Sequence, residues 1–123
     1  MQIAIVGPSA SGKSTLVAAL RAAGYDARHV AQEHSYVPAL WRRITRPDVL
    51  IYLDANDQTV RARRPHSLET PHWLDDERRR LAHARAHCDL YLPTDYLSPA
   101  QVQEKVLDFL QTVTTPEQTP SRY

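Results

Sequence analysis

Four residues near the start of the chain have the types and the spacing that phosphate chemistry requires. Gly7 and Gly12 bracket a short segment, and Lys13 and Ser14 follow the second glycine directly. Glycine permits backbone conformations that a Cβ would resist, so the N–H groups between the two glycines can turn inward around phosphate oxygens. A lysine adds positive charge there, and a serine hydroxyl can ligate Mg²⁺. The spacing therefore predicts a loop that binds a polyphosphate with Mg²⁺.

The whole stretch from Gly7 to Thr15 fits the pattern G-x-x-x-x-G-K-[ST], the P-loop or Walker A motif. Its flanks also fit, because the apolar run 2–6 predicts a strand and the apolar spacing in 13–23 predicts a helix. The helix N-terminus would aim its positive dipole end at the same phosphates. We therefore expect ATP or another NTP as the ligand, with Lys13 also catalytic and Ser14 holding Mg²⁺. The nucleotide contacts are expected from Gly7, Ser9, Ala10, Ser11, Gly12, Lys13, Ser14 and Thr15.

Apolar periodicity along the rest of the chain predicts alternating strands and helices. A continuous apolar run predicts a buried strand over 48–54, and weaker runs predict strands over 25–31 and 90–93. Helices are predicted over 38–44, 57–64 and 73–87, and from Ser98-Pro99 onward. Such alternation produces a parallel sheet with helices on both faces. The sequence thus predicts an α/β fold, a small three-layer αβα sandwich with about four parallel strands, of the P-loop NTPase type.

Length and composition predict one small domain. The chain has 123 residues, of which 42% are hydrophobic and 24% charged, an ordinary globular composition. We expect a nucleotide-binding domain over 1–111 and a flexible tail over 112–123, because the tail is rich in Thr, Pro and Gln. The net charge of +1, without a dominant basic run, does not favour nucleic acid as a partner.

Cysteine usage and hydropathy bear on location. The single cysteine, Cys88, fits a reducing compartment. No apolar run reaches the roughly 20 residues of a membrane span, and the first predicted strand begins at residue 2, so no signal peptide is expected. We therefore predict a cytoplasmic protein without a membrane partner, and a homo-oligomer stays open.

Two carboxylates compete for the role of base or Mg²⁺ partner. The carboxyl ends of parallel strands meet at one edge of the sheet, which brings the loop together with segments 32–35 and 54–57. Glu33 follows the second predicted strand, and Asp54 ends an apolar run, as a Walker B aspartate does. A carboxylate at a strand end is also a common helix cap, so both interpretations stay open.

Clusters of arginine and histidine are the remaining candidates for chemistry. Arg61, Arg63 and Arg64 could clamp phosphates bidentately or form a solvated helix face. Segment 78–80 carries three arginines at helical pair spacing from acidic residues 75–77, which predicts surface charge. Two histidines, His83 and His87, lie four apart as metal ligands can, but no third ligand is evident. Both tryptophans, Trp41 and Trp73, are predicted to pack in the core or lid.

Three stretches make the chain resemble the P-loop nucleoside and nucleotide kinases, the group of thymidylate kinase and the deoxynucleoside kinases. They are residues 3–15, residues 46–55 with the Arg-rich helix that follows, and residues 88–95 with the helix opening at Ser98. The resemblance implies phosphotransferase activity with ATP and Mg²⁺. It also implies that lid arginines contact donor phosphates, that Glu33 acts as base on an acceptor hydroxyl, and that the loop after the last strand packs on adenine.

The chain departs from those kinases between the second and third predicted strands. A long insertion there supplies their acceptor-binding helices, whereas here only residues 36–45 are present. One hypothesis is a small kinase with a small-molecule phosphate acceptor. Another is an NTP-binding or slowly hydrolysing module, acting as a switch or completed by a partner. A third is a nucleic-acid accessory protein that uses the arginine clusters. Without an N-K-x-D motif for guanine, adenine is favoured.

Overall fold

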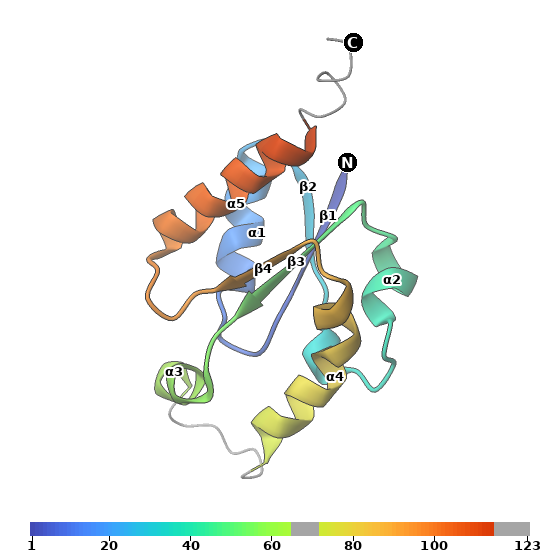
Figure 1. Cartoon of the computed structure of the whole chain (residues 1–123), viewed down its shortest axis with the longest axis vertical. Coiled ribbons are helices and arrows are strands. Elements are labelled where there is room, and N and C mark those ends of the chain that lie inside the picture. Colours follow the sequence, from blue (N-terminus) through green and yellow to red (C-terminus); the bar gives the residue numbers. More distant parts are fainter. Residues whose placement is uncertain (65–71, 115–123) are drawn as a thin grey trace.

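A computed structural model describes residues 1–64 and 72–114 of the chain. Four parallel strands form one sheet in the order β2-β1-β3-β4 (Figure 1). The strands are β1 (Gln2–Val6), β2 (Asp26–His29), β3 (Val49–Asp54) and β4 (Leu90–Pro93). In this order β1 lies between β2 and β3, so β2 and β4 are the edges. After β1 the chain adds β2 on one side of it and then crosses over to add β3 on the other side. Such a reversal of strand order opens a crevice at the carboxyl end of β1.

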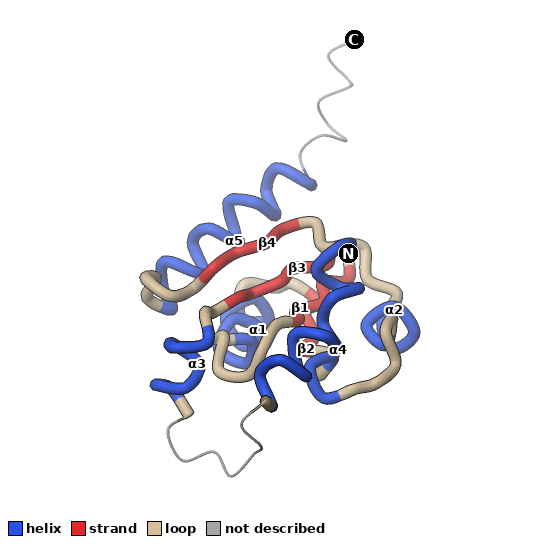
Figure 2. The backbone as a smooth tube through the Cα atoms, turned by 60° about the horizontal axis from the view of Figure 1, so that its bottom comes forward, coloured by secondary structure: helices blue, strands red, loops and turns tan. Residues whose placement is uncertain are grey.

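Helices cover both faces of the sheet (Figure 2). The helical elements are α1 (Lys13–Ala22), the 3₁₀ turn η1 (Gln32–His34), α2 (Leu40–Thr45), α3 (Asp57–Arg63), α4 (Trp73–His87) and α5 (Pro99–Thr114). One face packs against α1 and α5, and the other packs against α2 and α4. No helix in the described ranges is long and apolar enough to cross a membrane.

The alternation of strand side chains explains the two cores. In β1, Ile3 and Ile5 face α1 and α5, whereas Ala4 and Val6 face α2 and α4. All six residues of β3 are buried. Since each face of the central strands lies under helices, a continuous apolar run is what this position requires. Burying apolar surface on both faces stabilises the sheet by roughly 25 cal/mol per Å² removed from water.

The predicted α/β class, the parallel sheet of four strands and the order of elements are confirmed. Both tryptophans pack as predicted, with Trp41 and Trp73 only 6% and 8% exposed. The edge strand β2 has four residues, of which Ala27 alone is buried. The strand was predicted over 25–31, and its last two residues lie between β2 and η1.

Helix α5 continues past residue 111, where the domain was predicted to end. The tail was expected to begin at residue 112, but α5 continues to Thr114. Val113 packs against the core beside the apolar stripe of α5, which extends the helix by about one turn. The remainder of the predicted tail, 115–123, and the predicted connection over 65–71 lie outside the described residues.

Candidate functional site

The loop between β1 and α1 has a backbone that only its glycines adopt without strain. Gly12 has φ +100°, in the left-handed region, and a Cβ built there would meet no atom within 4 Å. Gly7 has φ +152°, and a Cβ there would lie 2.0 Å from the Leu53 carbonyl oxygen. Gly7 therefore lets the loop lie against β3, and Gly12 leaves the outer side of the loop open.

Lys13 is held in the interior of this loop. Its Nζ donates to the carbonyl oxygens of Gly7 and Pro8, both at 2.8 Å, and lies 2.8 Å from Glu33 Oε2. The Lys13 and Glu33 side chains are 5% and 3% exposed. The structure thus brings together two of the predicted catalytic residues, one from α1 and one from η1. Removing either partner would leave a buried charge uncompensated.

Two buried oxygen atoms of the loop region and η1 have no hydrogen-bond partner among the described residues. They are Oε1 of Glu33 and Oγ of Ser11. A buried polar atom without a partner costs about 1–3 kcal/mol, so such atoms commonly serve a ligand, an ion or water. A carboxylate oxygen is also the ligand type that Mg²⁺ prefers. These atoms are therefore available to a bound hydroxyl, metal-bound water or phosphate.

Histidines flank Glu33 on both sides. The Nε2 atoms of His29 and His34 lie 3.9 Å and 3.8 Å from Glu33 Oε2. Burial lowers the pKa of His29, and the charge of Lys13 lowers it further. Sequence reasoning missed both histidines. The sequence feature that could have identified them is their position close to Glu33 in the chain, His29 before it and His34 directly after it.

A first cavity of about 440 Å³, the loop pocket, opens above Lys13 and Glu33. It is lined by Ser9, Ala10, Gly12, Lys13, Ser14, Thr15, His29, Glu33, His34 and Arg64. Six of the eight predicted loop contacts are among them. Gly7 lies beneath, where its carbonyl holds Lys13, and Ser11 faces the second cavity. The pocket therefore presents backbone amides, a hydroxyl-bearing helix start and cationic side chains to one small volume.

A second cavity of about 470 Å³, the apolar pocket, lies on the other side of the loop. Its walls come from the loop, α1, α5 and the β4–α5 connection: Ala10, Ser11, Gly12, Thr15, Leu16, Ala19, Arg63, Thr94, Leu97, Pro99, Ala100, Val102 and Gln103. The two pockets share Ala10, Gly12 and Thr15. One ligand can therefore place an apolar ring in one pocket and charged groups in the other.

The three arginines at the end of α3, of which Arg64 directly follows the helix, have different positions. Arg63 donates to the Ala10 carbonyl at 2.7 Å and to the Thr94 carbonyl at 3.3 Å, which ties α3 to the loop and to β4. Arg64 lines the loop pocket and stacks over Trp73, with its Cζ 5.1 Å from the ring centre. Arg61 is exposed, and within the described ranges it lines neither pocket. Two of the three predicted phosphate contacts therefore reach the site.

Asp54 lies in a structural network. Its Oδ1 accepts from the Ala55 N–H at 2.8 Å and from Arg78 Nη1 at 3.1 Å, and its Oδ2 accepts from the Tyr91 hydroxyl. Neither pocket is lined by Asp54 among the residues described. The structure thus does not bring Asp54 to Lys13 and Glu33, because its carboxylate is engaged on the α4 side of β3.

This tyrosine–aspartate network predicts a pH dependence of stability. Burial raises the pKa of Tyr52 and of Tyr91, and the Asp54 carboxylate raises both further. The fold favours the neutral phenols, so this stabilisation is present below about pH 10, the unfolded pKa, and is lost as pH rises above it. We expect the free energy of unfolding, measured in urea, to fall as the pH rises above about pH 10. Tyr52→Phe should flatten this fall, whereas Tyr96→Phe, at a side chain 93% exposed, should not.

Helix α4 holds three different strand ends. Glu77, which is 2% exposed, accepts from the N–H and the hydroxyl of Ser9, both at 2.8 Å. Arg78 pairs with Asp54 and Asp57, and Arg80 donates to the Glu33 carbonyl at 3.1 Å. The prediction that this segment carries only surface charge is therefore wrong, and its acidic and basic residues position the site. Glu77 shares its helical spacing with the buried residues Leu74, Leu81 and Ala84, which indicates that it lies on the buried face of the helix.

The histidines of α4 stack on each other and contact Trp41. The His83 and His87 rings stack with centres 4.2 Å apart, and Trp41 Nε1 donates to His83 Nδ1 at 3.3 Å. Within the described part of the chain, no group of three or more His, Cys, Asp or Glu side chains is arranged to hold a metal ion.

Comparisons with known proteins do not identify a family: no family model matches the chain, and no curated protein sequence matches it significantly.

Proposed function

We propose that this protein binds ATP or another NTP with Mg²⁺ through a P-loop and acts as a small phosphotransferase of the nucleoside or nucleotide kinase type. The buried Lys13–Glu33 pair carries the proposal, because it lies at the floor of a pocket rimmed by the glycine loop. Positive charge, open backbone amides and an unpartnered carboxylate oxygen are the groups that phosphoryl transfer requires.

The two pockets fit the two halves of a nucleotide. The phosphates would lie in the loop pocket, on the backbone of the loop and against Lys13. The base would lie in the apolar pocket, between Leu16, Leu97 and Pro99. This division supports the expectation from the kinase resemblance that the β4–α5 connection contacts the base.

Each residue of the loop pocket has a specific task in this proposal. Ser14 is exposed at the first turn of α1 and would hold Mg²⁺, which would neutralise phosphate charge. Lys13 exchanges its contacts with the Gly7 and Pro8 carbonyls for phosphate oxygens. Glu33 Oε1, which has no partner in the described structure, accepts the proton of an attacking hydroxyl. Arg63, the last residue of α3, and Arg64, which follows it, add positive charge.

A second candidate is an NTP-binding or slowly hydrolysing module. The observation that favours it is the position of α2, which occupies the segment where the resembling kinases carry their acceptor region. Trp41 of α2 is buried against the sheet, so this helix serves the core. ADP formation by the purified protein separates the two candidates: dependence on a hydroxyl-bearing acceptor indicates a kinase, and a constant slow rate indicates hydrolysis.

Calorimetric titration tests the placement of the nucleotide. We expect binding of Mg-ATP and, more weakly, of Mg-tripolyphosphate, which has no base. Gln103→Trp fills the apolar pocket from α5 and should weaken ATP binding by about tenfold, or about 1.4 kcal/mol, without affecting tripolyphosphate. Glu104→Trp places the same bulk on the exposed side of α5 and should affect neither ligand. Absence of any Mg²⁺-dependent binding would refute the proposed function.

A further inference from the structure

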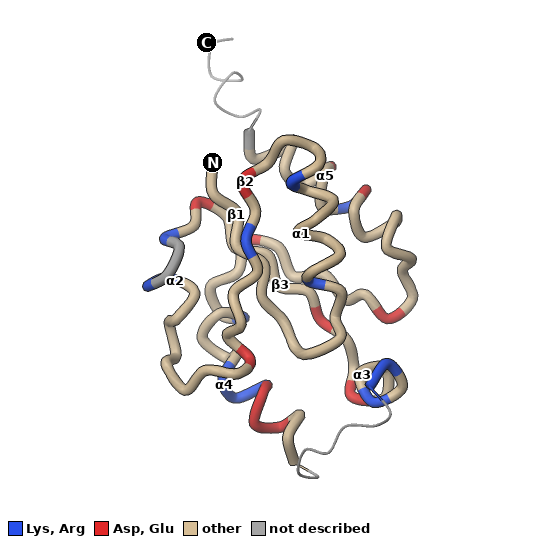
Figure 3. Tube along the Cα trace, turned by 180° about the vertical axis from the view of Figure 1, so that it is seen from behind, with Lys and Arg blue, Asp and Glu red and all other residues tan. Residues whose placement is uncertain are grey.

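A third cavity runs along the outer edge of the sheet, between α1 and the edge strand β2. This edge groove has a volume of about 510 Å³. Ser14, Ala18 and Arg21 line it from α1, and Asp26, Arg28 and His29 line it from β2. Figure 3 shows α1 and β2 side by side on this side of the molecule. The groove is separate from α2, so the short segment between β2 and β3 does not limit it.

The edge groove continues the loop pocket. The two cavities share Ser14 and His29, and the loop pocket in turn shares Gly12 and Thr15 with the apolar pocket. The three cavities therefore follow one another around the first turn of α1. A nucleotide with its base in the apolar pocket and its phosphates in the loop pocket would direct its terminal phosphate toward the edge groove.

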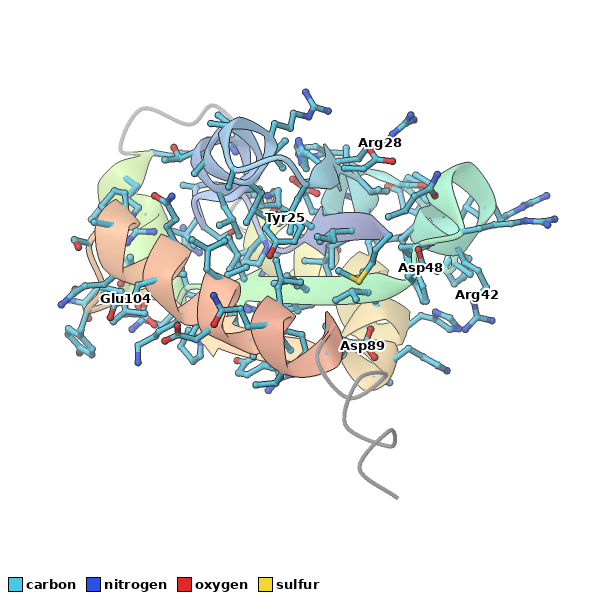
Figure 4. The ribbon with its side chains drawn as sticks, turned by 90° about the horizontal axis from the view of Figure 1, so that it is seen from above. Tyr25, Arg28, Arg42, Asp48, Asp89 and Glu104 are labelled. Atoms are coloured by element: carbon cyan, nitrogen blue, oxygen red, sulfur yellow. The ribbon has the colours of Figure 1, made fainter. Side chains whose placement is uncertain are left out.

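The charge of the groove is positive. Two arginines, Arg21 and Arg28, and one acidic residue, Asp26, line the groove, and His29 adds a ring nitrogen. The Nε of Arg21 donates to the Ala27 carbonyl at 2.8 Å, which fixes the guanidinium at the strand edge. Arg28 is exposed, makes no hydrogen bond or ion pair with any described residue, and projects outward in Figure 4. A guanidinium group can donate two parallel hydrogen bonds to two oxygens of one phosphate, so this position suits a phosphomonoester.

We propose that the edge groove binds the phosphate acceptor and that this acceptor is a small molecule with a phosphomonoester at one end and a hydroxyl at the other. The proposal rests on the proposed function. Arg21 follows Ser14 by seven residues on α1, which separates their backbone positions by about 10 Å. An acceptor of the size of a sugar phosphate spans this length, with its phosphate at Arg21 and Arg28 and its hydroxyl at Ser14 and His29.

The transfer step balances without any further reactant. The hydroxyl oxygen of the acceptor bonds to the γ-phosphorus of ATP, while the bond from that phosphorus to the β–γ bridging oxygen breaks. ADP leaves with the electron pair of the broken bond, and the hydroxyl proton passes to Glu33. The phosphomonoester at the arginines does not react, and it sets which hydroxyl of the acceptor reaches the γ-phosphate.

Binding measured with the nucleotide site saturated tests the proposal. The probes are ribose 5-phosphate and ribose, titrated by NMR into the protein with Mg²⁺ and a non-hydrolysable ATP analogue. We expect ribose 5-phosphate to bind at least about tenfold more tightly than ribose and to shift the Arg28 side-chain resonance. Arg28→Gln should abolish this preference. Arg43→Gln, at an exposed arginine of α2 on the opposite face of the sheet, should preserve it.

The outcomes separate the acceptor proposal from the proposed function. Binding of the ATP analogue, followed by equal affinities for ribose and ribose 5-phosphate, overturns the edge groove as an acceptor site and leaves nucleotide binding intact. A phosphate preference that survives Arg28→Gln also overturns it. Failure of the analogue to bind overturns both proposals. ADP formation that rises with ribose 5-phosphate, and falls at least about tenfold in Arg28→Gln, supports the complete proposal.

Discussion

Lys13→Met is expected to abolish Mg-ATP binding and to lower the free energy of unfolding by about 3–5 kcal/mol. Lys13 supplies the charge nearest the proposed phosphates, and it is also the cation beside the buried Glu33 carboxylate. Without it, the Glu33 carboxylate stays in a site where 2% of the residue surface is exposed, with His29 and His34 at 3.9 Å and 3.8 Å. Calorimetric titration measures the loss of binding, and urea denaturation measures the loss of stability.

The double variant Lys13→Met/Glu33→Gln separates these two effects. A neutral amide at position 33 no longer needs a buried cation, so most of the lost stability should return. Nucleotide binding should not return, because the positive charge is still absent. If Lys13→Met were as stable as the unmodified protein, the buried pair would not be the source of stability that its burial indicates. If the double variant bound Mg-ATP normally, the role of Lys13 in phosphate binding would be wrong.

Glu77→Ala is expected to lower the free energy of unfolding by about 2–4 kcal/mol and to weaken Mg-ATP binding. The substitution leaves the N–H and hydroxyl of Ser9 without their shared acceptor in a buried position. The loop would then lose its contact with α4. Nucleotide binding would be weaker because the loop would lose conformational entropy when it becomes ordered around the ligand. Thermal denaturation and calorimetric titration measure the two effects on the same preparation.

Two further substitutions on α4 are the controls for Glu77. Glu77→Gln keeps one carbonyl acceptor for the Ser9 N–H and should therefore recover part of both losses. Asp75→Ala removes a carboxylate of the same helix that is 64% exposed, and should change stability by no more than about 0.5 kcal/mol. A Glu77→Ala protein with unchanged nucleotide affinity would show that α4 supports only the fold and not the loop.

The role of α4 shows where reasoning from sequence stopped. The spacing of its apolar residues predicted the helix with the correct ends, 73–87. Its charged residues were predicted to pair with one another. Helical spacing identifies only partners three or four residues apart, and it does not show contacts with distant parts of the chain. The predicted pairing holds for Arg79, which pairs with Asp76 on the surface. Glu77 and Arg78 instead find partners 68 and 24 residues away.

The same limit explains the opposite outcomes for the two strand-end carboxylates. Both were placed at the correct edge of the sheet, since parallel strands end together. Glu33 then pairs with Lys13, whereas Asp54 pairs with Arg78 and Tyr91. Two different long-range contacts separate them: Glu33 meets Lys13 at the start of α1, and Asp54 meets Arg78 of α4 and Tyr91 of β4. Neither can be read from the residues next to them in the chain.

The sequence by itself determined the elements and the loop. Glycine positions, apolar periods and helix starts act over a few neighbouring residues, so strands β1 and β3, helices α1 and α4, and the phosphate-type motif could all be predicted. Only the tertiary structure decided which charged side chains form ion pairs with each other. The strand order β2-β1-β3-β4 brings β2 directly beside β1, which places Glu33 against Lys13 and opens the edge groove along α1. Long-range pairing depends on packing two sheet faces at once, and that is a property of the whole fold.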